Sequence, residues 1–492
     1  MNEKPKRKLR WRLLRWGLIV LAMLVTLVAV LITEENWRGK HAWENYKHDA
    51  EARGDSFVWA DFAPTNVPDD QNFFCAPIVT KALQHERNKD VDNPSAHSPY
   101  RLNFNMYRGA SENWPEHGGD WQKAELTDLK QWQRYFRTFN ETPEGKTNGF
   151  PVPAPSQTPA ADVLSALSCF TPALDELRQA SLRPYARMPL DYASGFDSIS
   201  VATSHLATEK RCAQFLLLRS IAELQDDQAG PALADIELLL RLTDTLRDQP
   251  FLISHLVRIA MQHITLQAIY EGLAQHRWND AQLADLETAL AAKDYLADFQ
   301  FAMRGERTCA IATFENWRRT HEMKSVAEGR NGVDTVVTNS MRLMPAAFFY
   351  QNELAFARLH EHLVLPLVDM TNRTVSVATF NHDEADIKEM AKHYSPYTVL
   401  ANMSFPAVSK SVQKFATVQG QVDLARVACA LERYHLAHGE YPSSLDTLAP
   451  QFIEKIPHDI INGQPLHYRR TDDAKYVLYS VGWNETDDGG QV

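Results

Sequence analysis

A run of residues without any charged side chain, WGLIVLAMLVTLVAVLI, begins at Trp16 and ends at Ile32. As an α-helix, these residues would extend about 25 Å, because each helical residue rises about 1.5 Å. The hydrocarbon core of a bilayer is about 30 Å thick, and the apolar residues at 11, 13 and 14 can lengthen the span. The pattern therefore predicts a transmembrane anchor over residues 16–33, and the remainder of the chain must fold beside a membrane.

Charged residues on the two sides of this run predict its orientation. Residues 1–15 hold seven Lys or Arg side chains and one acid, Glu3, whereas Glu34 and Glu35 follow the run. Positive residues favour the cytoplasmic side. We therefore expect a basic cytoplasmic arm (1–15), a single-pass anchor in the inner (cytoplasmic) membrane, and a periplasmic or otherwise extracytoplasmic body. A cleaved signal peptide is the alternative, but the apolar run exceeds the usual core of about 7–15 residues and no Ala-x-Ala-like site follows it.

The rest of the chain is acidic. Since the basic arm carries +6 and the whole chain −11, the remaining residues carry −17. Such a body repels phosphate, which argues against a nucleic-acid partner. With 492 residues, of which 44% are hydrophobic and 23% charged, the chain is a folded protein of two or three domains.

Cysteine spacing excludes two common kinds of site. No CxxC pair is present, so neither a zinc ribbon nor a thioredoxin-like site is indicated. An oxidising compartment permits up to two disulfides, but spacing does not choose partners, and ordinary burial is favoured for most of the thiols. The five cysteines are Cys75, Cys169, Cys212, Cys309 and Cys429.

Periodicity divides the middle of the chain into two regions. Residues 37–160 are mixed, aromatic and loop-rich, with one helix predicted over 124–139, where Leu126, Leu129, Trp132 and Phe136 share a face. We interpret its tryptophans as core packing, with a carbohydrate or peptide platform as the minor alternative. They are Trp43, Trp59, Trp114, Trp121 and Trp132.

Residues 161–415 are predicted to form a helical body. Helices are expected over 230–250, over 251–275 and after a cap at Asn279 or Asp280. A further helix over 344–370 should break near Pro366, and a charged helix should follow over 381–394. Short turns imply antiparallel hairpins, which resemble helical-repeat proteins such as tetratricopeptide-like pairs, although no consensus recurs at a fixed period. Stacked hairpins usually provide binding surfaces.

Residues 416–492 predict one helix packed on a small antiparallel sheet. The helix should end at Gly439, where a left-handed C-cap belongs. A short helical turn capped by Ser443 follows, and Asn462–Gly463 and Asp472–Asp473 are turns that delimit two strands. The predicted fold class is therefore mainly α: an N-terminal transmembrane helix, an α-hairpin body and a small α+β C-terminal domain.

The order of motifs in this domain is similar to a known family over residues 418–490. The matching residues are Leu431, Tyr434, Tyr441–Pro442, Leu445, Leu448, Pro457, Asp459, Gly463, Tyr468 and Tyr479–Ser480–Val481–Gly482. Together they resemble the C-terminal globular domain of the type II secretion system major pseudopilin. The chain departs from that family at its N-terminus: no Glu lies in the early turns of the apolar helix, and most of the chain separates this helix from the domain. The resemblance implies a pseudopilin-like tip mounted on an anchored helical body.

The same resemblance implies a calcium site in the loop after the last strand. By position, the candidate ligands are Asn484, Asp487 and Asp488. Oxygen ligands on a glycine-containing loop suit calcium, although the spacing is not that of an EF-hand. A solvated acidic tail is the alternative. No other cofactor is expected.

No catalytic motif is present: Gly-x-Ser-x-Gly, His-Glu-x-x-His, a Walker loop and a dinucleotide fingerprint are all missing from the sequence. Four polar groups are candidate sites by residue type, and a structural or solvated role is favoured for each. They are His360–Glu361–His362; His382, Asp383, Glu384 and His393; His255 and His263; and Arg304, Glu306 and Arg307, interpreted as a surface ion-pair set.

Two functions follow from these observations. The leading hypothesis is a non-enzymatic scaffold or binding protein of the bacterial cell envelope, anchored in membrane lipid and linked to other envelope or secretion proteins of a type II secretion-like system. The alternative is an extracytoplasmic hydrolase whose active site is assembled from scattered residues.

Overall fold

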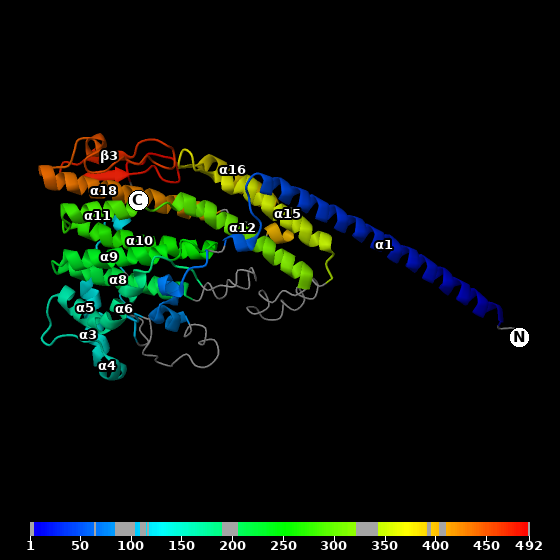
Figure 1. The fold of residues 1–492 in the computed structure, drawn as a ribbon, viewed down its shortest axis with the longest axis horizontal. Helices are drawn as coiled ribbons and strands as arrows, with labels where there is room; N and C mark the ends of the chain where they lie inside the picture. The colour runs from blue at the N-terminus through cyan, green and yellow to red at the C-terminus, as the bar shows by residue number, and fades with distance from the viewer. Residues whose placement is uncertain are drawn as a thin grey trace.

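The computed structural model describes residues 4–62, 65–83, 104–108, 115, 118–188, 205–320, 343–390, 395–402 and 410–490. The fold is mainly helical, at 67% helix, with two small antiparallel sheets of two strands each. The predicted fold class is therefore confirmed. Helix α1 (Lys4–Ala52) projects from one end of a bundle, and the C-terminal strands lie at the other end (Figure 1).

The remaining elements follow in chain order. The helices are α3 (Leu129–Glu141), α4 (Pro143–Asn148), α5 (Pro159–Leu167), α6 (Thr171–Ser181), α8 (Leu206–Gln225), α9 (Ala229–Asp244), α10 (Leu252–Ala274), α11 (Asp280–Ala291), α12 (Tyr295–Thr320), α15 (Ala346–Leu363), α16 (Val377–Met390) and α18 (Ser411–His438). The strands are β1 (Val368–Asp369), β2 (Thr374–Val375), β3 (His467–Arg470) and β4 (Tyr476–Tyr479). Short 3₁₀ turns include η1 (Trp59–Phe62), η4 (Trp121–Lys123), η7 (Leu365–Leu367) and η8 (Leu445–Leu448).

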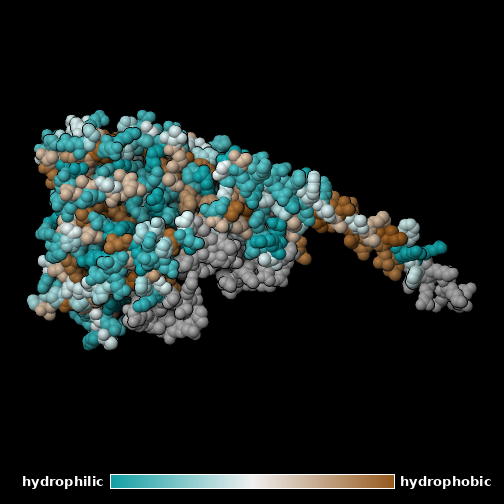
Figure 2. All heavy atoms as spheres, viewed as in Figure 1, coloured by the Kyte–Doolittle hydropathy of each residue, from teal (hydrophilic) through white to brown (hydrophobic). Residues whose placement is uncertain are grey.

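The apolar half of α1 makes no contact that buries it, so it is consistent with a single membrane anchor or a signal sequence. Figure 2 shows hydrophobic residues gathered along this projecting half, whereas the visible face of the body is mostly hydrophilic. The helix does not stop where the sequence placed the end of the anchor. It continues through residues 34–52, and Trp43 and Ala50 are buried there. Residues 37–52 are therefore helical and not loop-rich.

The second half of α1 is docked on α15. A Cβ added at Gly39 would lie 3.4 Å from the Cα of Ala347, so the two helix backbones approach closely. The Asn36 side chain accepts a hydrogen bond from the backbone N–H of Ala347 at 2.7 Å. This contact lies one turn after Ile32, so the body begins directly where the apolar run ends.

Helices α8, α9 and α10 pack as the predicted antiparallel hairpins, whereas α11 packs chiefly against α18 (Figure 1). Helix α11 begins with a capping box, in which Asn279 and Gln282 each accept from the other's backbone N–H. Helix α3 begins later than predicted, because the Asp128 side chain caps it by accepting from the Lys130 N–H. Leu126 therefore lies before the helix and is 45% exposed, which corrects the expectation that it shares the buried face.

The C-terminal module has the predicted order of elements. Helix α18 ends at Gly439, whose φ of 78° is left-handed, and β3 pairs with β4. The cap of η8 is Ser444, which accepts from the Asp446 N–H, and not Ser443. The module is continuous with the body, because Phe415 of α18 belongs to the main core while Leu431 belongs to the module's own core.

Candidate functional site

A groove of about 650 Å³ lies between α10, α18 and the end of the chain. Helices α10 and α18 form its floor, and η4 forms one wall. That wall is attached to α10, because the Gln267 side chain accepts from the Trp121 N–H at 2.7 Å and the Glu271 carboxylate accepts from the Thr127 N–H at 2.9 Å. The groove is thus built from segments that are far apart in the sequence.

The opposite wall is β4 and the residues after it. Nine consecutive residues, 476–484, line the groove. Strand β4 pairs with β3 in the register Tyr468↔Leu478, and within the described residues no strand pairs with its other side. No residue of β3 lines the groove in the part of the chain that the structure describes. The groove therefore runs along the unpaired edge of β4.

Small side chains keep the floor open. A Cβ added at Gly420 of α18 would meet no atom within 4 Å. Its neighbour Gln421 is 6% exposed, and the side-chain oxygen of Gln421 has no hydrogen-bond partner among the described residues. Sequence reasoning missed both residues, because a helix carrying a glycine and a glutamine has no pattern that distinguishes a groove from a solvent face.

The groove is almost uncharged. Among the described residues that line it, Asp488 is the one with a formal charge, and none is His, Cys, Glu, Lys or Arg. Of the tryptophans weighed as a platform, Trp121 lines the groove, whereas Trp43, Trp59 and Trp132 are buried as core packing predicts. Trp114 lies outside the described residues.

The predicted calcium ligands lie in successive turns after β4. Asn484 accepts from the Thr486 N–H, and Asp488 accepts from the Gly490 N–H. Asp487 accepts from the Tyr479 hydroxyl at 2.7 Å, and this hydrogen bond holds the pKa of Asp487 below its usual value. In the described part of the chain, no group of three His, Cys, Asp or Glu side chains is placed to hold a metal ion. The calcium site stays a prediction.

The histidine groups are dispersed. His360 is buried, with a pKa lowered to about 3 by loss of solvation, while Glu361 points to α1 and accepts from the Tyr46 hydroxyl at 2.6 Å. His255 is also buried, with a pKa of about 3, and contacts the Gln249 carbonyl oxygen at 3.0 Å. Both imidazoles are therefore neutral near pH 7. Burial also lowers the pKa of His263.

Two members of the polar group on α16 are neighbours in the structure. The His382 ring nitrogen lies 3.6 Å from the Asp383 carboxylate, and the His382 side chain is 76% exposed. His393 lies outside the described residues, so its position relative to Glu384 is untested.

The arginine group on α12 differs from the prediction. Arg307 is fully buried, and its guanidinium contacts the Asp55 carboxylate at 3.2 Å and lies 4.6 Å from the centre of the Phe57 ring. Arg304, which is 46% exposed, lies 3.7 Å from the same carboxylate. Glu306 accepts from the Leu252 N–H. The expected surface ion-pair set is therefore wrong for Arg307, because the segment after α1 folds over it.

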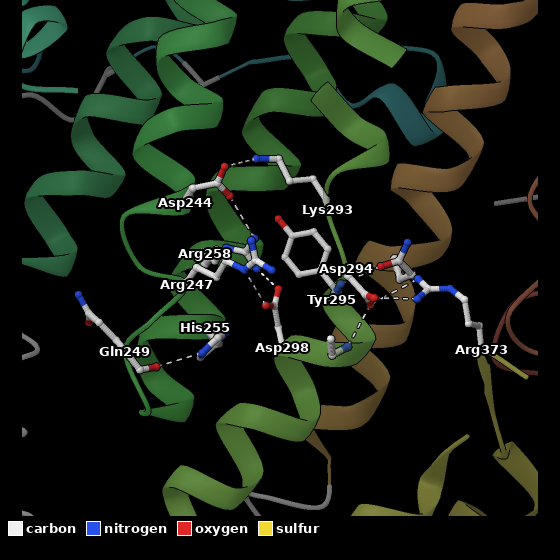
Figure 3. A network of polar contacts seen from close by, with 12 residues as sticks. Asp244, Arg247, Gln249, His255, Arg258, Lys293, Asp294, Tyr295, Asp298 and Arg373 are labelled. Carbon is white, nitrogen blue, oxygen red and sulfur yellow. Dashed lines mark hydrogen bonds and ion pairs between the residues drawn. The ribbon is translucent and has the colours of Figure 1, made fainter. Parts of the chain in front are cut away.

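A second buried polar network joins α9, α10 and α12 (Figure 3). Arg258 is 1% exposed and lies between the carboxylates of Asp244 and Asp298, with its guanidinium 4.6 Å from the centre of the Tyr295 ring. Lys293 reaches Asp244 at 2.5 Å, and burial lowers the pKa of Lys293. Each buried cation faces a carboxylate, so the network is a structural joint.

The structure describes all five cysteines, and each is a free thiol. Cys212, Cys309 and Cys429 are buried, as predicted for most of them, and burial raises their pKa. Cys169 is exposed and Cys75 is half-buried. These thiols are uncharged near pH 7.

Comparison with known proteins assigns this chain to no family. No family model matches the chain, and neither a curated protein nor a solved structure matches it. The function must therefore be argued from the groove and from the way the body is joined to the apolar helix.

Proposed function

We propose that this chain is a membrane-anchored scaffold or binding protein of the bacterial cell envelope. The basic arm lies in the cytoplasm and the body outside it. The observation that carries the proposal is the groove along the unpaired edge of β4, whose described lining has one formal charge, Asp488. The C-terminal strands lie at the end of the body away from the free end of α1 (Figure 1). The pseudopilin-like order of motifs in the same module supports a link to a type II secretion-like system.

The shape of α1 supports a retained anchor over a cleaved signal. Proteases act on exposed, extended segments, whereas residues 33–52 are helical and their later turns are docked on α15. Trp37 is 63% exposed just beyond the apolar run, which suits the headgroup region where tryptophans are enriched. The inner membrane is the location that this combination favours.

The chemistry of the groove supports binding over catalysis. Hydroxyl nucleophiles need an adjacent base to activate them, and general acid–base chemistry relies most often on His or a carboxylate. The described lining holds hydroxyl groups such as that of Ser480, but its one carboxylate is Asp488 and it has no His, Cys or Lys. Away from the groove, the buried pairs Arg258–Asp298 and Arg307–Asp55 join segments of the body. Three other buried titratable side chains, His205, Glu209 and Cys212, line a separate cavity against α8. A groove of several hundred Å³ with few polar groups is typical of a binding site.

Photo-cross-linking in intact cells tests the proposal. A photoreactive amino acid replaces Gly420 in the groove or, as a matched control, Gly230 on α9; neither position has an atom within 4 Å of an added Cβ. We expect a discrete protein adduct in the membrane fraction from position 420 and none from position 230. Recovery of the wild-type chain in the soluble fraction without its first thirty or so residues, or no adduct from position 420, would contradict the proposal.

A further inference from the structure

We infer that the groove binds an extended polypeptide segment of another protein, which adds as a strand to the free edge of β4. The inference rests on the proposed binding function and names the chemistry of the partner: a chain of mostly apolar residues with one basic group at the end that meets Asp488.

Residues on both faces of the sheet line the groove, which shows that the groove meets the strand at its backbone edge. Tyr476 and Leu478 pack toward α18, with the module's core. Val477 and Tyr479 lie on the other face, where a Cβ added at Gly490 would be 3.2 Å and 2.9 Å from them. Successive strand residues point to opposite faces, so a groove that touches all four must run along the edge.

The hydrogen-bond pattern shows which backbone groups face the groove. The Thr471 N–H donates to the Lys475 carbonyl at 2.9 Å, which makes this a hydrogen-bonded pair. Bonded and non-bonded pairs alternate in an antiparallel ladder. Positions 476 and 478 are therefore non-bonded pairs, and their N–H and C=O groups point away from β3. The Val481 N–H donates to the Asp459 carboxylate on the β3 side. The backbone groups of residue 480 therefore point away from β3, like those of residues 476 and 478.

The floor of the groove leaves room beside this edge. A Cβ added at Gly420 of α18 would meet no atom within 4 Å, and Gln421 next to it also lines the groove. The Gln421 side-chain oxygen has no hydrogen-bond partner among the described residues, but it is buried from solvent, so a peptide could bond to it only after the side chain turned toward the groove. A peptide lying along β4 would therefore rest on the floor at Gly420.

The charge at one end of the groove favours extended segments that carry a basic residue. Within the described lining, Asp488 is the single formal charge, and Asp487 lies beside it with 52% of its side chain exposed. An acidic segment would be repelled at this end, whereas a Lys or Arg would be attracted. A lipid acyl chain could occupy the apolar floor but would leave the outward N–H and C=O groups of β4 without partners.

Selection from a library tests the inference. The detergent-solubilised full-length chain is used to select from a displayed library of random nonapeptides, and the Kd of an enriched peptide is measured by fluorescence polarisation. We expect enriched sequences to alternate in apolar residues and to carry Lys or Arg near one end. N-methylation of alternate peptide amides in one register should weaken binding at least about tenfold, because it removes ladder hydrogen bonds, and in the other register it should have little effect.

Variants of the protein locate the site. Gly420→Leu should weaken binding about tenfold or more by filling the groove, whereas Gly230→Leu should leave the Kd unchanged. Asp488→Asn should weaken binding about threefold for a peptide ending in Lys, and not for the same peptide ending in norleucine.

Several outcomes would overturn the inference: no enriched peptide, equal affinity for Gly420→Leu, or equal effects of N-methylation in both registers. Binding of a fluorescent hexadecanoic acid that Gly420→Leu abolishes, with no peptide enriched, would assign the groove to lipid instead. If the cross-linker at position 420 captures a protein but no library peptide binds, the binding function is retained and strand addition is refuted. If the cross-linker captures no protein and no peptide binds, both proposals are refuted.

Discussion

The two ends of the body differ in what their polar groups face. At the membrane end, Arg307 and Asp55 form a buried ion pair where the chain leaves α1, and Glu361 accepts from Tyr46 across the α1–α15 contact. At the far end, no strand pairs with the outer edge of β4 among the described residues. Contacts between distant segments hold the membrane end together, whereas an unpaired strand edge is available to another molecule.

Replacing Arg307 should have the largest effect. Arg307→Met leaves the Asp55 carboxylate facing a buried apolar side chain, and breaking a buried ion pair costs about 3–5 kcal/mol. We expect a loss of about 3 kcal/mol in the free energy of unfolding, measured by urea titration in detergent. Arg304→Met is the matched control: Arg304 lies 3.7 Å from the same carboxylate but is half-exposed, so its loss should cost less than about 1 kcal/mol. If Arg307→Met and Arg304→Met lower the free energy of unfolding by the same amount, the prediction is wrong.

The second prediction concerns pH at the membrane end. Glu353 of α15 is fully buried, and burial raises its pKa to about 8, although Arg318 lies 3.9 Å away on α12 and Lys47 of α1 also lowers it. Because the unfolded carboxyl has a pKa near 4.3, unfolding between about pH 4.3 and 8 releases a proton. The stability of the wild type should therefore fall as pH rises through this window.

Glu353→Gln should reduce this dependence by the part that Glu353 contributes, because burial also raises the pKa of Glu209 and of Glu223 to about 8. We expect the variant to gain stability relative to the wild type as the pH rises from 5 to 8, by more than about 1 kcal/mol. Urea unfolding at the two pH values measures this gain. Glu44→Gln, at a carboxylate with 53% side-chain exposure on α1, is the control and should show no such difference. A wild type whose stability is independent of pH from 5 to 8 would contradict the prediction.

The third prediction concerns the open floor of the groove. Gly420→Ala adds a methyl group where no atom lies within 4 Å, and it should raise stability by about 0.5–1 kcal/mol because alanine favours a helix interior. Gly272→Ala in α10 should destabilise by about 1–3 kcal/mol, since its Cβ would lie 2.1 Å from the Trp278 ring nitrogen. Thermal unfolding of both variants distinguishes an open site from a packed one. Destabilisation by Gly420→Ala would mean that the floor is occupied.

The smallest expected effect is that of calcium on the module's last loop. If Asn484, Asp487 and Asp488 hold calcium, then adding it should raise the Tm by a few degrees, about 1 kcal/mol of linkage. Asp487→Ala together with Asp488→Ala should abolish the increase. An unchanged Tm for the wild type in millimolar calcium would remove the site.

Several elements could be predicted because their causes are local. The Asn279 capping box, the left-handed Gly439 and the pairing of β3 with β4 all lie where neighbouring residues place them. The extension of α1 through Ala52 could not be predicted from neighbouring residues. Its buried residues face α15, which is about three hundred positions away in the chain, and periodicity within α1 does not name that partner.

An apolar N-terminal helix, a helical body and a capped helix beside a two-stranded sheet can be predicted from the sequence, since periodicity, caps and turns act within a few residues. Only the folded chain shows that Arg307 is buried by Asp55 and Phe57, and that Gly420, Gln421 and the edge of β4 meet in one groove. Burial and convergence depend on contacts between distant segments, and no local pattern records such contacts.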